Sequence, residues 1–297
     1  MFCQKIISPK LRLTLKRILL LTLLFGFTTF TFAASDLSVL SFNIRYATEK
    51  DGVNAWSHRK DLAASVFKDN DVDFAGLQEA LITQINDLQE RLPNYAWVGV
   101  GRDDGKEKGE LSPIFYRKDR FELIKSGTFW LSKTPEVVAS KDWDAAITRI
   151  ATWARFKEIK TGKEIMFVNT HFDHVGETSR QESAKIIAAK MTELADGLPT
   201  LLTGDFNTPL GSKGIQTILD LKSPKLYNTQ AISKKPHFGG EASFNGFGTA
   251  PERPYIDFVF ATKHFKVQKH GFIKLKQGDV FVSDHWPVWA ALRLRSE

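Results

Sequence analysis

Two histidine motifs in the sequence combine residue types that can move a proton. Ser283-Asp284-His285 comes shortly before an apolar run that begins at Val288, and Asn169-Thr170-His171 closes another apolar run. Because the pKa of an imidazole is ordinarily about 6.5, a histidine can accept or donate a proton near neutral pH. A single histidine is more often structural than catalytic, but one that is paired with a carboxylate is a candidate general base.

Asp257 is the carboxylate that best suits His285 as a partner. It lies inside the apolar run 255–260, where a carboxylate is costly to bury unless it is paired. Asp284 adjoins His285 in the chain, and neighbouring side chains of an extended segment point in opposite directions. We therefore expect Asp257, and not Asp284, to orient the imidazole of His285.

Carboxylates and amides supply further candidate ligands. Asp205 and Asn207 follow the apolar run 200–203 and lie two residues apart, so both side chains can point the same way and hold a water and a phosphoryl oxygen. A polar turn is the competing interpretation. Glu79 ends a short apolar run, where a lone carboxylate suits Mg²⁺. A set rich in carboxylate and amide oxygen favours Mg²⁺, Mn²⁺ or Ca²⁺ over zinc.

The elements that must position these side chains are strands. They are expected over residues 37–44, 74–77, 114–116, 121–131, 150–159, 164–169, 200–203, 255–261 and 288–294, with helices over 57–70, 81–92 and 178–195. The last helix is expected to begin with a capping box formed by Ser179 and Glu182. Many strands with few helices predict two packed sheets with helices outside, in a single α/β domain over residues 34–297.

Six candidate residues lie at or just beyond the ends of these strands, as a site built on a rigid sheet requires. For any one of them, a strand end is simply where polar residues begin. That explanation is weaker for all six together, which are Asn43, Glu79, His171, Asp205, Asp257 and His285.

The first 33 residues have the pattern of a secretory signal peptide. Five basic residues and no acidic one precede the uncharged stretch 18–32, which ends in small residues around Ala33. An uncleaved membrane anchor is the alternative, but the apolar stretch is short against the roughly 20 residues that a spanning helix needs. We expect cleavage after Ala33, export to the periplasm or the medium, and no stable membrane insertion afterwards.

Cleavage would change the charge of the chain. The 297 residues carry 41 basic and 34 acidic residues, a net charge of +7. Removing the five basic residues of the signal peptide leaves 36 against 34, a net charge of +2. Nucleic acid is therefore a partner that the mature charge does not favour. The mature chain would also lack cysteine, because Cys3 is the only one, which rules out disulfides and thiolate chemistry.

Taken in chain order, the motifs resemble those of the endonuclease/exonuclease/phosphatase superfamily. The matching pieces are Ser41-Phe42-Asn43-Ile44-Arg45, Leu77-Gln78-Glu79, Asn169-Thr170-His171, Gly204-Asp205-Phe206-Asn207, Ile256-Asp257-Phe258 and Ser283-Asp284-His285-Trp286-Pro287-Val288. The stretch from Asp51 to Arg59 is similar to a loop in exported bacterial members. The resemblance implies a four-layer sandwich, with two mixed β-sheets packed face to face and helices on the outside.

The resemblance also implies roles for the residues that match. Glu79 resembles the ligand of the metal ion, expected to be Mg²⁺ with Mn²⁺ or Ca²⁺ as alternatives, and Asn43 and Asp284 resemble members of the surrounding metal and water network. His285 resembles the base that activates water, and Asp257 resembles the residue that orients it.

Four further residues resemble the family's catalytic side chains. Asp205 and Asn207 resemble the pair that positions the nucleophile and the phosphoryl oxygens. His171 resembles the histidine that binds phosphate, and Glu110 resembles the carboxylate that is paired with this histidine in DNase-like members. Outside this set, we interpret Asp173 and His174 as solvent-facing loop residues.

These features predict a monomeric, metal-dependent hydrolase that cleaves a small or lipid-like phosphoester with an activated water. Such a reaction needs an in-line water and neutralisation of charge on the phosphoryl oxygens. An exported nuclease acting on DNA or RNA is one alternative, and it would show basic stripes and a steep salt dependence. A non-catalytic binding module of the same fold is the other, and it has no physical need to retain the full set of site residues.

Overall fold

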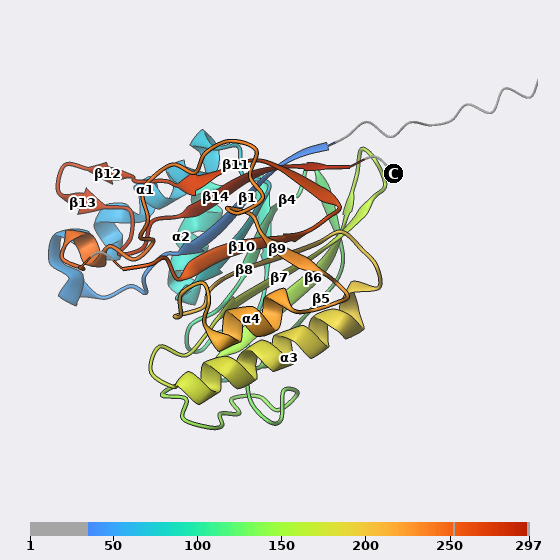
Figure 1. Ribbon diagram of the computed structural model, residues 1–297. Helices are drawn as coiled ribbons and strands as arrows, with labels where there is room; N and C mark the ends of the chain where they lie inside the picture. Colours follow the sequence, from blue (N-terminus) through green and yellow to red (C-terminus); the bar gives the residue numbers. More distant parts are fainter. Residues whose placement is uncertain (1–34, 252, 296–297) are drawn as a thin grey trace, which may run out of the picture. The chain divides into compact units, whose positions relative to one another are not determined.

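Apolar runs of the sequence form two six-stranded sheets in the computed structural model, which describes residues 35–251 and 253–295 (Figure 1). Both sheets are mixed, because β1 runs parallel to β2 and β7 runs parallel to β8 while the other neighbours are antiparallel. The predicted signal peptide and its cleavage site lie outside the described residues. The domain boundary at residue 33 therefore stays a prediction.

The first sheet contains strands from both ends of the described chain. Its strands, in spatial order, are β11 (Phe265–Phe272), β14 (Val288–Leu294), β1 (Ser35–Asn43), β2 (Phe74–Gln78), β4 (Ile114–Arg117) and β3 (Tyr95–Val98). The second sheet contains β5 (Phe121–Trp130), β6 (Ile150–Glu158), β7 (Glu164–His171), β8 (Thr200–Asp205), β10 (Asp257–Thr262) and β9 (Leu226–Asn228). A short hairpin consists of β12 (Lys276–Gln277) and β13 (Val280–Phe281).

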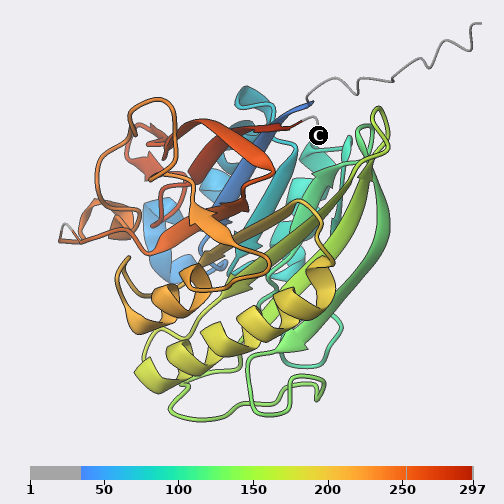
Figure 2. The same cartoon turned by 45° about the vertical axis from the view of Figure 1, so that its right-hand side comes forward.

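Helices cover the outer faces of the two sheets, as two views of the ribbon show (Figure 2). α1 (Trp56–Asp69) and α2 (Ile82–Arg91) pack on the first sheet, and α3 (Glu177–Ala195) and α4 (Lys213–Leu219) pack on the second. Two 3₁₀ helices, η1 (Glu49–Asn54) and η2 (Gly246–Gly248), lie in connecting loops. Within the described part of the chain, no helix is both long enough and apolar enough to cross a bilayer.

Three apolar layers hold these four layers of structure together. In β1, Val39 faces the second sheet, whereas Leu40 and Phe42 face α1 and α2. Between the sheets, the ring of Phe74 lies 4.3 Å from that of Phe121 and 5.0 Å from that of Phe156. Central strands are apolar on both faces because both faces are covered. The predicted four-layer sandwich is confirmed.

Some elements were not foreseen in the sequence. The strand β11 alternates apolar residues with lysines and carries a bulge between Val267 and Lys269, so its apolar run is broken. The predicted capping box of α3 is wrong. The helix begins at Glu177, and the distant carboxylate of Asp144 accepts hydrogen bonds from the backbone N–H of Thr178 and Ser179, at 3.1 and 2.7 Å.

A buried amide fastens the two sheets to each other beneath the strand ends. Asn169 of β7 donates from Nδ2 to the carbonyl oxygens of Leu77 and Pro113, at 2.7 and 3.0 Å. Its Oδ1 accepts from Gln78 and Thr203, at 2.7 and 3.0 Å. All four hydrogen-bonding positions of the amide are used, so the sheets are fixed in separation and register here.

A buried histidine of β11 makes stability depend on pH. His270 is 1% exposed, and its Nδ1 lies 2.8 Å from Nδ1 of His237. Burial, followed by the charge of His237, lowers the pKa of His270 to about 3. The unfolded chain binds a proton at this residue below about pH 6.5 and the folded chain does not, so the free energy of unfolding decreases as pH falls from 6.5 toward 3.

We predict that His270→Gln reduces this dependence. Between pH 7 and pH 5 the free energy of unfolding should fall by about 2 kcal/mol more in the unaltered protein than in the variant. Urea unfolding at the two pH values measures the difference, with the exposed His58→Gln as the matched control. Equal pH dependence in the unaltered protein and the His270 variant would contradict the assignment.

Candidate active site

Strand ends from both sheets meet around one cavity of about 530 Å³. His171 ends β7 and Asp205 ends β8, and the two residues are paired across these parallel strands. Asp257 begins the antiparallel strand β10, where it pairs with Asp205. Asn43 ends β1 of the other sheet, and its side chain reaches Asp205. The topology therefore places carboxylates, an amide and an imidazole in contact.

The structure brings all nine predicted site residues together. Two of them, Asn43 and Asp257, support the site from behind by hydrogen bonds to residues that line the cavity. The other seven line the cavity itself: Glu79, Glu110, His171, Asp205, Asn207, Asp284 and His285.

His285 is held by one carboxylate and faces a second. Its Nδ1 lies 2.9 Å from Oδ2 of Asp257, which is 1% exposed. Because a carboxylate only accepts, Nδ1 is the donor, and Nε2 remains for proton transfer. Nε2 lies 3.7 Å from Oδ2 of Asp205. The expected orientation of His285 by Asp257 is therefore present.

The charges around His285 set its protonation. Burial alone would lower the pKa of His285, but the carboxylates of Asp257 and Asp205 outweigh burial and raise it well above its ordinary value. Burial, followed by repulsion from Asp257, raises the pKa of Asp205 to about 7. A carboxyl group that titrates near neutrality, as Asp205 does, is suited to proton transfer near pH 7.

Asp205 lies at the centre of the site. Its Oδ2 accepts from Nδ2 of Asn43 at 3.0 Å, and its Oδ1 accepts from the backbone N–H of Asn207 at 2.9 Å. Oδ2 also lies 3.6 Å from Nε2 of His171, almost the same distance as to His285. Asp205 therefore lies between the two imidazoles, at nearly equal distances from their Nε2 atoms.

His171 is a neutral hydrogen-bond acceptor in this arrangement. Nδ2 of Asn207 donates to Nε2 of His171 at 3.0 Å and to the carbonyl oxygen of Phe172 at 3.0 Å. The carbonyl oxygen of Phe172 can only accept, so the group of Asn207 that faces it is the NH₂ group. Nε2 of His171 must therefore accept the other hydrogen bond from that NH₂ group. Burial, followed by the charges of Arg149 and His285, lowers the pKa of His171 well below its ordinary value.

Direct pairing of Glu110 with His171 does not occur. The Glu110 carboxylate accepts from Nη1 of Arg102 at 2.7 Å, and Nδ1 of His171 is buried without a hydrogen-bond partner. A charge-assisted bond to arginine is stronger than one to a neutral imidazole, which explains the exchange of partners. A space of about 10 Å³ lined by these residues separates Glu110 from His171 and is close to the smallest that holds one water.

Arg149 and His174 line the cavity although the sequence did not single them out as site residues. Arg149 is 4% exposed, and its Nη2 lies 3.0 Å from Nδ1 of His174, which is exposed as expected. The expectation that Asp173 faces solvent is wrong, because Asp173 is 0% exposed. Nη1 of Arg149 has no hydrogen-bond partner, and Nε makes no hydrogen bond but lies 3.7 Å from Oδ2 of Asp173. A buried guanidinium with unused donors suits an anion. The only signal in the sequence is an arginine directly before a strand.

Three non-glycine residues at the site have left-handed backbone conformations. The φ angles are 56° at Arg45, 59° at Glu79 and 48° at Asn207, and each residue lies just beyond a strand, β1, β2 or β8. Such angles are strained for residues with a side chain. Hydrogen bonds to site groups hold them, including the bond from the N–H of Arg45 to Oδ1 of Asn43 at 3.0 Å.

The buried hydrogen bonds of Arg59 give the Asp51–Arg59 stretch a structural role beside the site. Arg59 is 0% exposed and donates to the carbonyl oxygens of Ile44, Arg45 (2.9 Å) and Asn54 (2.7 Å), and more weakly to that of Val282 (3.4 Å). The first two carbonyls follow Asn43, and Val282 precedes the Ser283–His285 motif. One buried guanidinium therefore holds the chain segments that carry Asn43 and Asp284.

Comparison with known proteins agrees with this geometry. The family model described as "Endonuclease/Exonuclease/phosphatase family" matches residues 40–285. The chain belongs to this family. Members of the family are metal-dependent phosphoester hydrolases, so the resemblance found in the motifs is confirmed.

Solved structures of the family include close relatives of the chain. An endonuclease/exonuclease/phosphatase from Bacteroides vulgatus is 40% identical, with a TM-score of 0.84 over 88% of this chain and 100% of that one. A mannosyl-6-phosphatase from Bacteroides thetaiotaomicron is 36% identical, with a TM-score of 0.80 over 86% and 99% of the two chains. An uncharacterised protein of Acanthamoeba polyphaga mimivirus is 23% identical in an alignment 288 residues long, which covers 83% of this chain but only 39% of that protein.

The family's metal ion fits the carboxylates of Glu79 and Asp284. The guanidinium of Arg45 lies 3.9 Å from each carboxylate, so the two face a common space. Burial raises the pKa of Asp284, and repulsion from Glu79 contributes to the increase. A cation between these groups would relieve that repulsion. Oxygen ligands without thiolate suit a hard divalent ion.

A second group could also offer ligands. Atoms of Asp205, Asp257 and His285 lie within 4.8 Å of one another. In this group, however, Nδ1 of His285 and Oδ2 of Asp257 already form a hydrogen bond of 2.9 Å. A metal ion bound to both atoms would break that bond. The geometry therefore favours proton transfer for this group and metal binding for Glu79 with Asp284.

We predict that Glu79→Gln weakens Mn²⁺ binding by about tenfold or more, because the amide removes a negative oxygen ligand. Electron paramagnetic resonance titration of free Mn²⁺ measures the affinity, and the exposed Glu122→Gln on β5 is the control. Loss of affinity in Asp257→Asn with none in Glu79→Gln would instead place the ion in the second group.

We also predict that Arg59→Lys impairs the metal site as well as the fold. Lysine cannot reach four carbonyl oxygens, so the free energy of unfolding should fall by about 2 kcal/mol. Mn²⁺ affinity of the folded variant should fall about tenfold. Urea unfolding and Mn²⁺ titration test this against the exposed Arg295→Lys. A folded variant with unaltered Mn²⁺ affinity would limit Arg59 to a structural role.

Proposed function

We propose that the chain hydrolyses the phosphomonoester of a small molecule, using Mg²⁺ and a water activated by His285. One observation carries the proposal. His285 donates from Nδ1 to buried Asp257 and lines, with Nε2 near Asp205, a cavity whose wall also contains the carboxylates of Glu79 and Asp284. A base and a metal-binding pair on one small cavity are what water attack on a phosphate needs.

His285 supplies the base in this reaction. Nε2 accepts a proton from water as its oxygen bonds to phosphorus, and the bond from phosphorus to the alcohol oxygen breaks. Asp257 keeps Nδ1 protonated through its hydrogen bond and stabilises the imidazolium that forms. The departing alcohol oxygen takes up a proton from solvent water and the imidazolium releases its proton to solvent, so that the products are an alcohol and inorganic phosphate.

Other residues of the cavity hold the phosphoryl group. The unused donors of Arg149 and the amide of Asn207 lie beside His171 and suit phosphoryl oxygens. A divalent ion at Glu79 and Asp284 supplies charge neutralisation on these oxygens when it is bound. Positioning and electrostatic stabilisation then carry most of the rate enhancement, as they do in phosphoryl transfer generally.

Two observations support a small phosphomonoester as the substrate. The cavity of about 530 Å³ lies within the roughly 300–1,000 Å³ range of small-molecule sites. A relative that is 36% identical over 86% of the chain is a mannosyl-6-phosphatase. A phosphatase is therefore favoured over an enzyme that acts on a polymer.

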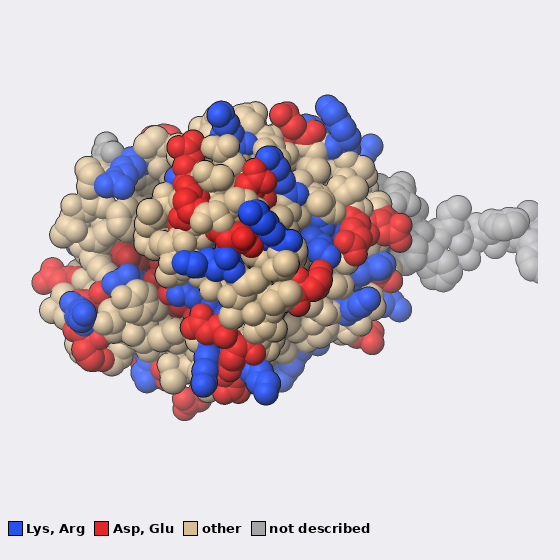
Figure 3. Space-filling model, turned by 90° about the horizontal axis from the view of Figure 1, so that it is seen from below, with Lys and Arg blue, Asp and Glu red and all other residues tan. Residues whose placement is uncertain are grey.

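A nuclease is less well supported. A nucleic-acid groove carries clustered Lys and Arg side chains. On the face seen in Figure 3, Lys and Arg alternate with Asp and Glu and form no continuous basic stripe. The expected net charge of +2 after removal of the signal peptide also argues against a nuclease. We retain export, Mg²⁺ as the ion and a monomeric state as parts of the proposal.

A substrate panel tests the function. The purified protein with Mg²⁺ or Mn²⁺ should release phosphate from mannose 6-phosphate and from p-nitrophenyl phosphate, and chelation by EDTA should abolish this activity. Bis(p-nitrophenyl) phosphate, plasmid DNA, RNA and sphingomyelin should be poor substrates. Activity confined to DNA or RNA would overturn the proposal in favour of a nuclease.

We predict that His285→Ala lowers kcat by about 10²- to 10⁴-fold, because it removes the general base. Stopped assays with p-nitrophenyl phosphate at saturating Mg²⁺ measure the loss, and His58→Ala on the exposed face of α1 is the control. Circular dichroism confirms that the variant is folded. Full activity of a folded His285→Ala protein would rule out the mechanism.

A further inference from the structure

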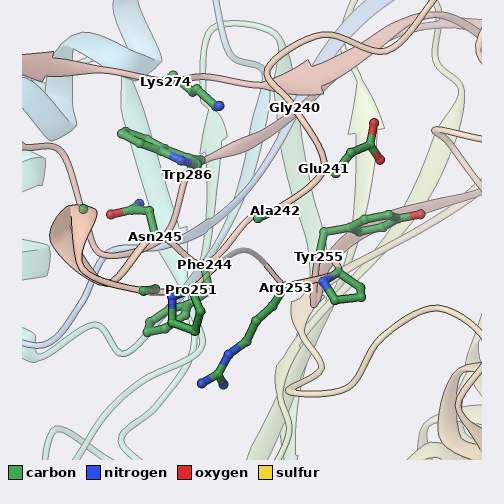
Figure 4. Close-up of a pocket in the computed structure, with 13 residues that line it drawn as sticks. Gly240, Glu241, Ala242, Phe244, Asn245, Pro251, Arg253, Tyr255, Lys274 and Trp286 are labelled. Atoms are coloured by element: carbon green, nitrogen blue, oxygen red, sulfur yellow. The ribbon is translucent and has the colours of Figure 1, made fainter.

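A second cavity, of about 610 Å³, adjoins the first (Figure 4). Phe244 and Arg253 line both cavities. Neither the family match nor the roles assigned above account for the second cavity. The two cavities are therefore neighbours that share part of their walls.

The loop that surrounds the second cavity is fastened to the catalytic segment. The backbone N–H of Trp286 donates to the carbonyl oxygen of Ser243 at 2.7 Å, and the N–H of Asn245 donates to that of Asp284 at 2.7 Å. The ring of Phe244 contacts the imidazole of His285 edge-on, with 5.0 Å between centroids. The second cavity therefore lies beside the segment that carries Asp284 and His285.

Aromatic side chains form two sides of the second cavity. In Figure 4, Trp286 and Tyr255 lie on either side of Ala242. The Trp286 ring packs against Phe281 at 5.5 Å, and the Tyr255 ring packs against Phe258 at 4.8 Å. These contacts hold the rings in place before a ligand binds. The cavity thus presents fixed flat apolar surfaces.

Charged side chains line the same cavity. Glu241, Lys274 and Arg253 belong to its wall. All three residues are exposed, so they lie at the rim of the cavity, where an acyl chain would offer them no hydrogen bond. A ligand with hydroxyl groups would satisfy them and could still cover the aromatic rings with its C–H faces.

We infer that the second cavity binds the alcohol half of the substrate, and that this half is a sugar ring. This inference rests on the proposed function. The ring joined most closely to a phosphate is a sugar both in hexose phosphates and in nucleotides. Because Phe244 touches His285 and borders the cavity, the ring nearest the phosphate is the one that Trp286 and Tyr255 contact. In a nucleotide, the sugar ring separates the nucleobase from the phosphorus, so the nucleobase lies farther from the phosphate than the sugar does.

Selectivity is the quantity that tests the inference. The ratio of kcat/KM for mannose 6-phosphate to kcat/KM for phenyl phosphate should fall by roughly tenfold to a hundredfold in Lys274→Met and Glu241→Gln, because only the sugar offers hydroxyl groups to these side chains. Trp286→Leu should lower the same ratio. Glu122→Gln and Lys263→Met, at exposed positions that do not line either cavity, are the matched controls.

Binding without turnover gives a second measurement. In the His285→Ala protein with Mg²⁺, saturation-transfer NMR should detect the ring protons of mannose 6-phosphate, and the signal should weaken when Trp286→Leu is added. This experiment does not depend on hydrolysis. If the unaltered protein hydrolyses no phosphoester but the ring protons show transfer, the proposed function fails and the sugar site stands.

Three results would overturn the inference while leaving the proposed function intact. One is an unchanged selectivity ratio in all three cavity variants of an active phosphatase. The second is a preference for adenosine 5′-monophosphate over mannose 6-phosphate that the Trp286 variant removes, which would assign the cavity to a nucleobase. The third is hydrolysis of phosphatidic acid in vesicles in preference to both, which would assign it to a lipid.

Discussion

The amide of Asn43 makes the contact on which the site depends. Its Nδ2 donates to Oε1 of Glu79 at 3.1 Å and to Oδ2 of Asp205 at 3.0 Å. Asn43 and Glu79 belong to the first sheet and its loops, whereas Asp205 belongs to the second. One side chain therefore fixes the carboxylate of Glu79, the proposed metal ligand, relative to Asp205, the proposed proton-transfer group. The aromatic core between the sheets, together with Asn169, keeps their separation constant enough for that contact to form.

Crowded negative charge is the cost of this arrangement. Asp205, Asp257 and Asp284 are each buried to 91% or more, and the first two face each other across paired strands. Burial and repulsion from neighbouring carboxylates both oppose the ionised forms of Asp205 and Asp284. The buried guanidinium of Arg59 offsets part of the charge of Asp284. The strained turns at Arg45, Glu79 and Asn207 add to the cost, as expected where structure is adapted to function rather than to stability.

The two cavities separate chemistry from recognition. The proposed reacting groups lie at ends of strands in two packed sheets, where rigid backbone fixes their geometry. The second cavity is formed largely by residues of the segments 240–251 and 253–255, which hydrogen bonds join to the Asp284 segment. Loops tolerate change more readily than central strands. Proteins with this sandwich can therefore keep one hydrolytic mechanism while differing in the alcohol they accept.

The sequence by itself determined most of the long strands, three helices and the candidate residues at strand ends, because apolar periodicity and polar strand ends are local patterns. The family resemblance added Glu110 and the role of Asp284. The sequence also paired Asp257 with His285, since a carboxylate inside an apolar run needs a partner. Only the tertiary structure decided that Arg102 takes the carboxylate of Glu110, that Asp144 caps α3, and that Arg149 and a second cavity adjoin the site. These contacts join residues far apart in the chain, and no local pattern encodes which distant partner reaches a given group first.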